Sequence, residues 1–140
     1  NNQQDRRMLC SAWNPLAFDY QGLPPCHVLW KVTVINGKLH LNWYQRSNDF
    51  FLGSPFNISS YALLTCLVAK VVGMEPGSIT YSAGDTHLYL NHIEQAKEQL
   101  TRTPYPFPQL NIKKDIKSLK EHNPSEPTIP HSELGKKLKL

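Results

Sequence analysis

The sequence predicts an α/β (α+β) fold in which strands and a long buried helix belong to one domain. A run rich in β-branched residues, Val28 to Ile35, precedes Asn36-Gly37 and a second, strictly alternating run. A stretch that would be apolar on nearly every side of a helix follows from Phe56 to Val72. The chain has 140 residues, a length that suits one domain, because domains usually hold about 100–150 residues.

The first two runs are predicted to form a β-hairpin, since Asn-Gly is the strongest short signal for a two-residue hairpin turn. The second run, Leu39 to Arg46, alternates between two faces, as a half-buried strand does. One face carries Leu39, Leu41, Trp43 and Gln45, and the other carries His40, Asn42, Tyr44 and Arg46. We expect this strand to deliver the polar residues that follow it to its end, where ligands are often bound.

The dipeptide Ser54-Pro55 predicts a helix start, with Ser54 as the N-cap and Pro55 at the first helical position. Apolar side chains then occupy nearly every side of the helix, which is typical of a helix buried within a sizeable domain. Gly73 is expected to end it. Covering such a helix requires more surface than the rest of the chain provides, so we expect further chain or a partner subunit to complete the core.

Shorter elements are expected after the helix. Glu75 to Gly77 predicts a turn, Ser78 to Ala83 a strand, and Asn91 to Leu100 a short helix. The proline-rich segment 103–108 predicts an extended loop, and Leu110 to Ile112 a final strand. The domain is therefore expected to span residues 1–112, followed by an irregular tail at 113–140.

The formal net charge of +4 and the pI of about 9.0 come largely from this lysine-rich tail. A basic tail is compatible with nucleic-acid or membrane contact. No aromatic residues interleave the lysines to stack on bases, so a solvated terminus is the favoured interpretation.

The three cysteines, Cys10, Cys26 and Cys66, have no paired spacing. This argues against a disulfide scaffold or a zinc site and favours a reducing compartment, so we expect a cytoplasmic protein. No apolar run reaches the roughly 18–20 residues that span a bilayer, and the first seven residues lack the apolar core of a secretory signal. Because the chain begins at Asn1 without methionine, we interpret it as a processed product or part of a longer chain.

Cys26 is the candidate nucleophile, because it precedes a strand, is followed by His27 and is approached through Pro24 and Pro25. The alternative is a buried structural cysteine, which is the commoner fate of an unpaired thiol. Cys10 and Cys66 lie in apolar runs and are assigned to that structural class.

Two pairs of residues suit anion binding. Arg46 and Ser47 place a guanidinium beside a hydroxyl, as phosphate recognition requires, although Arg46 could equally form a surface ion pair with Asp49. Arg6 and Arg7 form a second possible anion clamp, or else a solvated pair of terminal charges.

Three further residues suit a nucleoside. Asn57 offers an amide donor and acceptor side by side, which matches the edge of a pyrimidine, or else it bonds the helix terminus. His87 and Tyr89, two residues apart, would project to one side of an extended segment. They would hold a sugar hydroxyl or be satisfied polar groups of the core.

Four segments together resemble the thymidylate synthase family: "RRMLCSAWNP", "LPPCHVLW", "YQRSNDFFLGSPFNISSYALL" and "GDTHLYLNHIEQ". The resemblance covers about Asp5 to Ile112 and corresponds to the C-terminal half of that enzyme. It implies a large twisted mixed β-sheet and a homodimer joined across that sheet. It also implies reductive methylation of dUMP by 5,10-methylenetetrahydrofolate, which gives dTMP and dihydrofolate without a metal.

The resemblance also implies residue roles. It makes Cys26 the nucleophile that adds to uracil C6, and Asp49 a folate contact. The dUMP contacts that it implies are Arg46, Ser47, Asn48, Asp49, Asn57, His87 and Tyr89, with Arg6 and Arg7 reaching the phosphate of the opposite subunit.

Other features limit what this chain does alone. The family's N-terminal half is absent, and we expect it in the same polypeptide or in a second chain. His122 stands where the family usually has a tyrosine that helps to hold the sugar. Two alternatives stay open at this point: a pyrimidine (dUMP or dCMP) hydroxymethylase of the same family, and a non-catalytic nucleotide-binding fragment.

Overall fold

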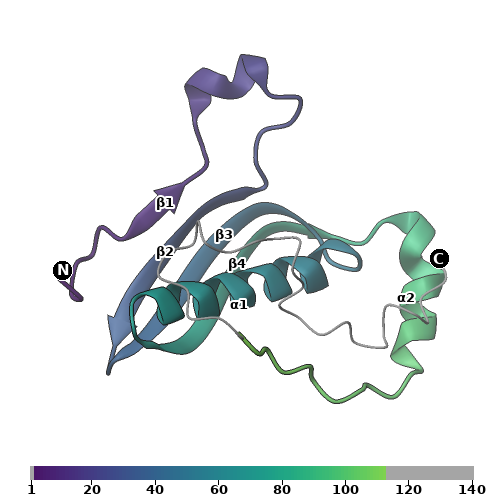
Figure 1. Ribbon diagram of the computed structural model, residues 1–140. Helices are drawn as coiled ribbons and strands as arrows, with labels where there is room; N and C mark the ends of the chain where they lie inside the picture. The colour runs from purple at the N-terminus through teal and green to yellow at the C-terminus, as the bar shows by residue number, and fades with distance from the viewer. Residues whose placement is uncertain (1, 113–140) are drawn as a thin grey trace.

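The computed structural model describes residues 2–112. These residues form a four-stranded sheet with one long helix across it, and a shorter helix beyond the end of the last strand (Figure 1). The elements, in chain order, are β1 (Leu9–Ser11), η1 (a 3₁₀ helix, Pro15–Tyr20), β2 (His27–Ile35), β3 (Lys38–Asp49), α1 (Gly53–Val71), β4 (Glu75–His87), η2 (a 3₁₀ helix, Leu90–His92) and α2 (Ile93–Leu100).

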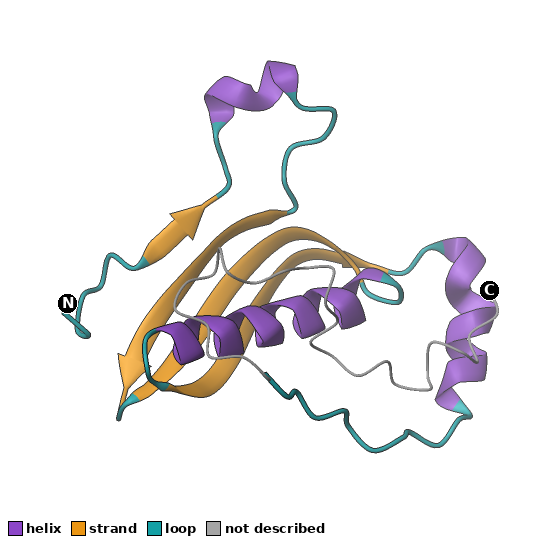
Figure 2. Cartoon of the chain, viewed as in Figure 1, coloured by secondary structure: helices purple, strands orange, loops and turns teal. Residues whose placement is uncertain are grey.

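The sheet is mixed, as expected of the α/β (α+β) class. Its strand order is β1-β2-β3-β4, with the first three strands antiparallel and β4 parallel to β3. Because neighbouring parallel strands need a crossover connection, α1 runs from the end of β3 back to the start of β4. Figure 2 shows that this helix lies across one face of the sheet.

The predicted hairpin is confirmed. Asn36 and Gly37 both have positive φ, 51° and 75°, as a two-residue turn matching the strand twist requires. Ile35 then pairs with Lys38 across the turn. The inward face of β3 is the predicted one, because Leu39, Leu41, Trp43 and Gln45 are all buried.

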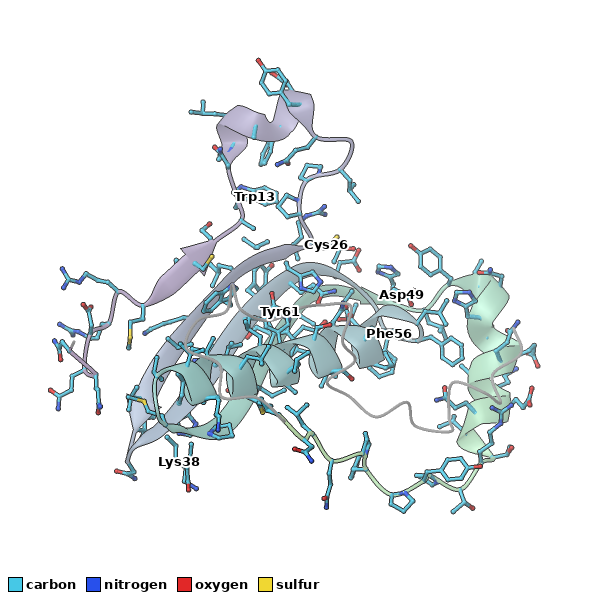
Figure 3. All side chains as sticks on the ribbon, viewed as in Figure 1. Trp13, Cys26, Lys38, Asp49, Phe56 and Tyr61 are labelled. Atoms are coloured by element: carbon cyan, nitrogen blue, oxygen red, sulfur yellow. The ribbon has the colours of Figure 1, made fainter. Side chains whose placement is uncertain are left out.

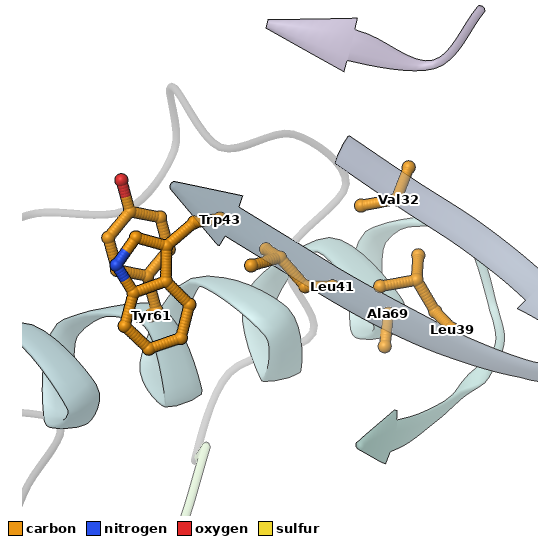
Figure 4. Close-up of a cluster of buried hydrophobic side chains, with 6 residues drawn as sticks. All are labelled: Val32, Leu39, Leu41, Trp43, Tyr61 and Ala69. Carbon is orange, nitrogen blue, oxygen red and sulfur yellow. The ribbon is translucent and has the colours of Figure 1, made fainter. Parts of the chain in front are cut away.

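The core lies between this face of the sheet and α1. Val32, Leu39 and Leu41 meet Ala69, while the Trp43 ring stacks on Tyr61 with the ring centroids 4.4 Å apart (Figure 4). Burial on every side of the helix, however, is not found in residues 2–112. Phe56 is 75% exposed, and Ile58 and Val72 also face outward, because the sheet covers only one side of α1.

The start of α1 differs from the prediction. The helix begins at Gly53, so Ser54 lies inside it and is not the N-cap. The Asp49 carboxylate instead accepts hydrogen bonds from the backbone N–H groups of Phe51 and Leu52, both at 3.2 Å. The Ser54 hydroxyl donates a hydrogen bond to the side-chain oxygen of Asn48. At the other end, Gly73 with φ 69° follows the helix, as predicted.

Three predictions after α1 need correction. Glu75, Pro76 and Gly77 form no separate turn but begin β4, which also extends past Ala83 to His87. The next α-helix begins at Ile93, because Leu90–His92 forms a 3₁₀ turn. Residues 110–112 pair with no strand. β1 and η1 were not predicted, since three-residue strands and 3₁₀ turns carry weak sequence signals.

The expected tail at 113–140, including His122, lies outside the described residues. In the described range, no helix combines the length and hydropathy needed to cross a bilayer.

A β-bulge in β4 brings Gly77 under the ring of His40. The register shifts between Leu39 and Leu41, and the backbone N–H of Ser78 donates to His40 Nδ1 at 3.1 Å. A Cβ at Gly77 would lie 2.7 Å from atoms of this ring. We therefore predict that Gly77→Ala displaces His40 and lowers the free energy of unfolding by about 1–3 kcal/mol, a usual cost of overpacking.

The measurement is urea unfolding of the protein and its variants. Gly22→Ala is the matched control, because a Cβ there has nothing within 4 Å and the φ of Gly22 is not positive. Equal stabilities of the two variants would show that the ring of His40 moves aside without lowering the free energy of unfolding.

Candidate active site

One end of the sheet collects most of the predicted site residues. The start of β2 and the ends of β3 and β4 meet there, because His27 pairs with Gln45 and Asp49 pairs with His87. Figure 3 shows Cys26 and Asp49 at this end and Lys38 at the opposite one. The first turns of α1 begin beside Asp49 and add Asn57 to the group.

Arg46 holds the segment that leads to Cys26. Its Nε donates to the carbonyl of Pro25 at 3.1 Å, and its Nη2 to the carbonyl of Pro24 at 2.6 Å. Its backbone N–H donates to the carbonyl of Cys26 at 2.9 Å. The guanidinium carbon lies 5.9 Å from the centre of the Trp13 ring, so Arg46 joins the end of β3 to the proline segment and to this ring.

The surface ion pair considered for Arg46 is not formed with Asp49 in the described residues. Asp49 Oδ1 accepts the two N–H bonds at the start of α1, which fixes the carboxylate there. The two side-chain bonds to carbonyls are made by Nε and Nη2, and the Nη1 group takes part in neither of them. This leaves Arg46 with donors for an anion.

Cys26 is a half-buried free thiol, and the ring of its neighbour His27 is directed toward Tyr61. His27 Nδ1 lies 3.2 Å from the hydroxyl oxygen of Tyr61, and the two rings stack with centroids 5.5 Å apart. Burial lowers the pKa of His27 below its ordinary value of 6.5. The imidazole is therefore neutral at pH 7, and the cation that is bonded to the segment carrying Cys26 is Arg46.

Asn57 is held by Gln45, a residue that the sequence analysis placed in the sheet but not in the site. Gln45 Nε2 donates to Asn57 Oδ1 at 3.1 Å and to the carbonyl of Ser47 at 3.0 Å. Gln45 is 3% exposed. The signal was present in the sequence, since Gln45 is the one polar residue on the otherwise apolar inward face of this strand.

Asn48 points into the protein. Its side chain accepts from the Ser54 hydroxyl at 2.7 Å, donates to the Thr86 hydroxyl at 3.4 Å, and the residue is 1% exposed. In this conformation it braces the start of α1 against β4. The neighbouring Ser47 is half-buried, on the strand segment that also carries Arg46 and Asp49.

His87 and Tyr89 lie together where β4 ends. Their rings meet edge to face with centroids 5.1 Å apart, and His87 Nδ1 lies 3.9 Å from a carboxylate oxygen of Asp85. Tyr89 is 52% exposed. The two side chains are therefore not buried polar groups of the core. They lie at the same end of the sheet as Cys26.

Arg6 and Arg7 lie far from this group along the sheet. β1 runs antiparallel to β2 with Leu9 opposite Lys31, so the residues before Leu9 lie toward the other end of β2. Arg7 forms a two-point pair with Asp5, with both N–O distances 2.9 Å, and Arg6 is exposed. Within one chain these arginines do not join the site.

The site thus combines a thiol, a cation and a fixed amide at the open end of a mixed sheet, which defines a candidate enzyme site for a small anionic substrate. The chain belongs to the thymidylate synthase family, because the family model described as "Thymidylate synthase" matches residues 1–139. This membership supports a folate-dependent enzyme of the methyltransferase kind, with a thymidylate synthase-type function.

We predict that His27 makes the protein less stable in mild acid. Its pKa is lowered in the folded state by burial, so the unfolded chain binds the proton more readily as the pH falls through about 6.5. The stability contributed by neutral His27 is complete above that pH and decreases below it, down to the folded pKa. Thermal unfolding at pH 7.5 and pH 5.5 measures this difference.

His27→Gln is the comparison variant, because glutamine keeps a polar group near Tyr61 but does not titrate. The difference in melting temperature between the two pH values is expected to be smaller in this variant. An unchanged difference would mean that His27 is protonated as easily in the folded chain as in the unfolded one.

Proposed function

We propose that the protein catalyses the reductive methylation of dUMP to dTMP with 5,10-methylenetetrahydrofolate as the one-carbon donor. The observation that carries the proposal is that one end of the sheet brings together Cys26, Arg46 and Asn57. These residues supply, in turn, a nucleophile, a cation that binds the phosphate and an amide that reads the base. Family membership supplies the reaction class.

Cys26 is the proposed catalytic nucleophile. Uracil C5 is too weak a carbon nucleophile to react unaided. The Cys26 thiolate forms a bond to C6, and the electrons of the C5–C6 double bond move through C4 onto its oxygen, which gives an enolate whose C5 is nucleophilic. When C5 has taken up the one-carbon unit and lost its proton, that unit is released from the folate nitrogen and takes up the hydride, and the S–C6 bond breaks, which restores the C5–C6 double bond and the thiolate.

Arg46 is proposed to bind the phosphate while it holds the Cys26 loop. Two of its groups are engaged with the carbonyls of Pro24 and Pro25, so the guanidinium is already oriented before an anion arrives. A fixed cation loses little conformational freedom on binding. Ser47, next along the strand, adds a hydroxyl donor.

Asn57 is proposed to read the pyrimidine edge. Its Oδ1 already accepts a bond from Gln45, which leaves the Nδ2 group to donate to the O4 atom of uracil. Such a donor also stabilises the charge that develops on O4 during the reaction, an effect worth roughly 2.7–4 kcal/mol for a preorganised donor. His87 and Tyr89 are proposed to hold the deoxyribose hydroxyl.

Asp49 is the proposed folate contact in this chain. Its Oδ1 is occupied by the backbone of Phe51 and Leu52, so the carboxylate is fixed, and Oδ2 has no hydrogen bond within the described residues. A fixed carboxylate oxygen fits the N–H donors of a pterin ring. When bound, the folate supplies both the methylene carbon and the hydride.

We propose that catalysis also needs the partner subunit and the family's N-terminal half. Arg6 and Arg7 lie too far along the sheet for the site in their own chain, which fits a homodimer in which they reach the partner's phosphate. The exposed side chains of Phe56 and Ile58 on α1 leave an apolar surface for the family's N-terminal half. Such surface is costly to leave in water.

We predict that Cys26→Ser abolishes turnover while dUMP still binds. A serine hydroxyl is a far weaker nucleophile than a thiolate at neutral pH, whereas the contacts of Arg46 and Asn57 remain. The measurement is dTMP formation in the full protein, together with the dissociation constant of dUMP. Cys10→Ser is the matched control, because Cys10 lies on β1 and is exposed, contrary to the expectation of a buried structural cysteine. Near-normal turnover in Cys26→Ser would remove this residue from the mechanism.

We predict that Asn57→Asp shifts the preference from dUMP toward dCMP. The carboxylate still accepts from Gln45 but cannot donate to O4 of uracil, whereas it can accept from the amine of cytosine. Since a buried polar group left unpaired costs about 1–3 kcal/mol, the loss for dUMP is expected to be roughly tenfold or more.

The measurement is kcat/KM for both nucleotides, with identification of the methyl or hydroxymethyl product. Asn111→Asp, at an exposed position, makes the same chemical change outside the site. Unchanged discrimination in Asn57→Asp would mean that this amide does not read the base.

A further inference from the structure

Behind Asn57, a chain of hydrogen bonds runs into the sheet. Gln45 Nε2 donates to Asn57 Oδ1 at 3.1 Å, and the hydroxyl of Tyr81 donates to Gln45 Oε1 at 3.2 Å. Gln45 is buried and Tyr81, on β4, is half-buried. The amide that faces the substrate side therefore has two further residues behind it.

The direction of this chain is fixed by a backbone group. The carbonyl of Ser47 can only accept, and it lies 3.0 Å from Gln45 Nε2. Gln45 must therefore present its NH₂ group to Ser47 and to Asn57, which requires Asn57 to present its oxygen in return. The NH₂ group of Asn57 is then the one left to face a ligand.

Tyr81 supplies the remaining partner of Gln45. Its ring stacks on Trp43 with centroids 4.3 Å apart and planes 9° from parallel, so the hydroxyl is held in place. Burial raises the pKa of Tyr81, with the Ser54 hydroxyl opposing part of this shift. The phenol therefore keeps its proton at neutral pH and acts as a donor toward Gln45 Oε1.

We propose that Tyr81 is a positioning residue for base recognition, which holds Gln45 so that Asn57 presents its NH₂ group to the 4-carbonyl of a pyrimidine nucleotide. Tyr81 does not touch the substrate. The inference rests on the proposed function, because it deepens the role given there to Asn57. It assigns the preference for uracil over cytosine to the hydrogen-bonded chain of Tyr81, Gln45 and Asn57.

The test is Tyr81→Phe in the full protein. Phenylalanine keeps the stack on Trp43 and removes only the donor, which leaves Gln45 Oε1 buried without a partner. The Gln45 amide then keeps its bond to the Ser47 carbonyl but loses the bond that holds its oxygen, so Gln45 and the Asn57 side chain bonded to it are held less firmly. The ratio of kcat/KM for dUMP to that for dCMP is expected to fall by about fivefold or more, as the loss of a buried partner implies.

The ratio is the decisive quantity, because general loosening of the fold lowers binding of both nucleotides together and leaves the ratio unchanged. Dissociation constants of dUMP and dCMP give the same comparison without turnover. Tyr20→Phe is the matched control, since Tyr20 is 90% exposed and loses the same hydroxyl. Its ratio is expected to equal that of the unmodified protein.

A second variant keeps the test decisive if Tyr81→Phe fails to fold. Gln45→Met has a side chain of similar length without the amide, and it breaks the chain at the next link, so it is expected to lower the ratio as well. A ratio unchanged in both variants, in a protein that discriminates dUMP from dCMP, would overturn the role of Tyr81 and leave the proposed function standing. If the unmodified protein does not bind dUMP, the proposed function fails, and this inference fails with it.

Discussion

The site depends on one stack of aromatic rings in the core. Trp43 is sandwiched between Tyr61 of α1 and Tyr81 of β4, with both centroid distances below 4.5 Å and both pairs of planes nearly parallel. Each tyrosine then directs its hydroxyl to a residue next to the site: Tyr61 to His27, and Tyr81 to Gln45. Apolar packing thus fixes the polar atoms that face the ligand side, because rings held face to face cannot swing their hydroxyl groups away.

Around the thiol, packing separates the two groups that could be cationic. His27 belongs to the buried side of β2 and is kept neutral there, whereas Arg46 lies on the loop side and is bound to two carbonyls of the proline segment. Cys26, the proposed nucleophile, and its neutral neighbour His27 therefore differ from a Cys–His ion pair of the protease type. In the proposed function the positive charge comes instead from the Arg46 guanidinium, whose bonds to the proline segment couple the position of the phosphate to that of the Cys26 segment.

Local sequence signals predicted the elements whose cause is local. The Asn36-Gly37 turn and the alternation along β3 follow from neighbouring residues alone, and both are present. The predicted N-cap at Ser54 was wrong because the helix begins one residue earlier, at Gly53, and the Ser54 hydroxyl donates to the side chain of Asn48 on β3. The turn at Gly77 was wrong because pairing with β3 draws those residues into a strand with a bulge. In both places a contact between elements overrode the local preference.

The sequence by itself determined the hairpin, the long apolar helix and, through its motifs, the family and the candidate residues. Only the tertiary structure decided which of them meet. It brought Cys26, Arg46 and Asn57 to one end of the sheet, left Arg6 and Arg7 apart, and buried Asn48. It also added Gln45 and Tyr81, to which the motifs assigned no role. The reason is that strand register and the β3-α1-β4 crossover set distances between residues far apart in the chain, and no local pattern encodes those distances.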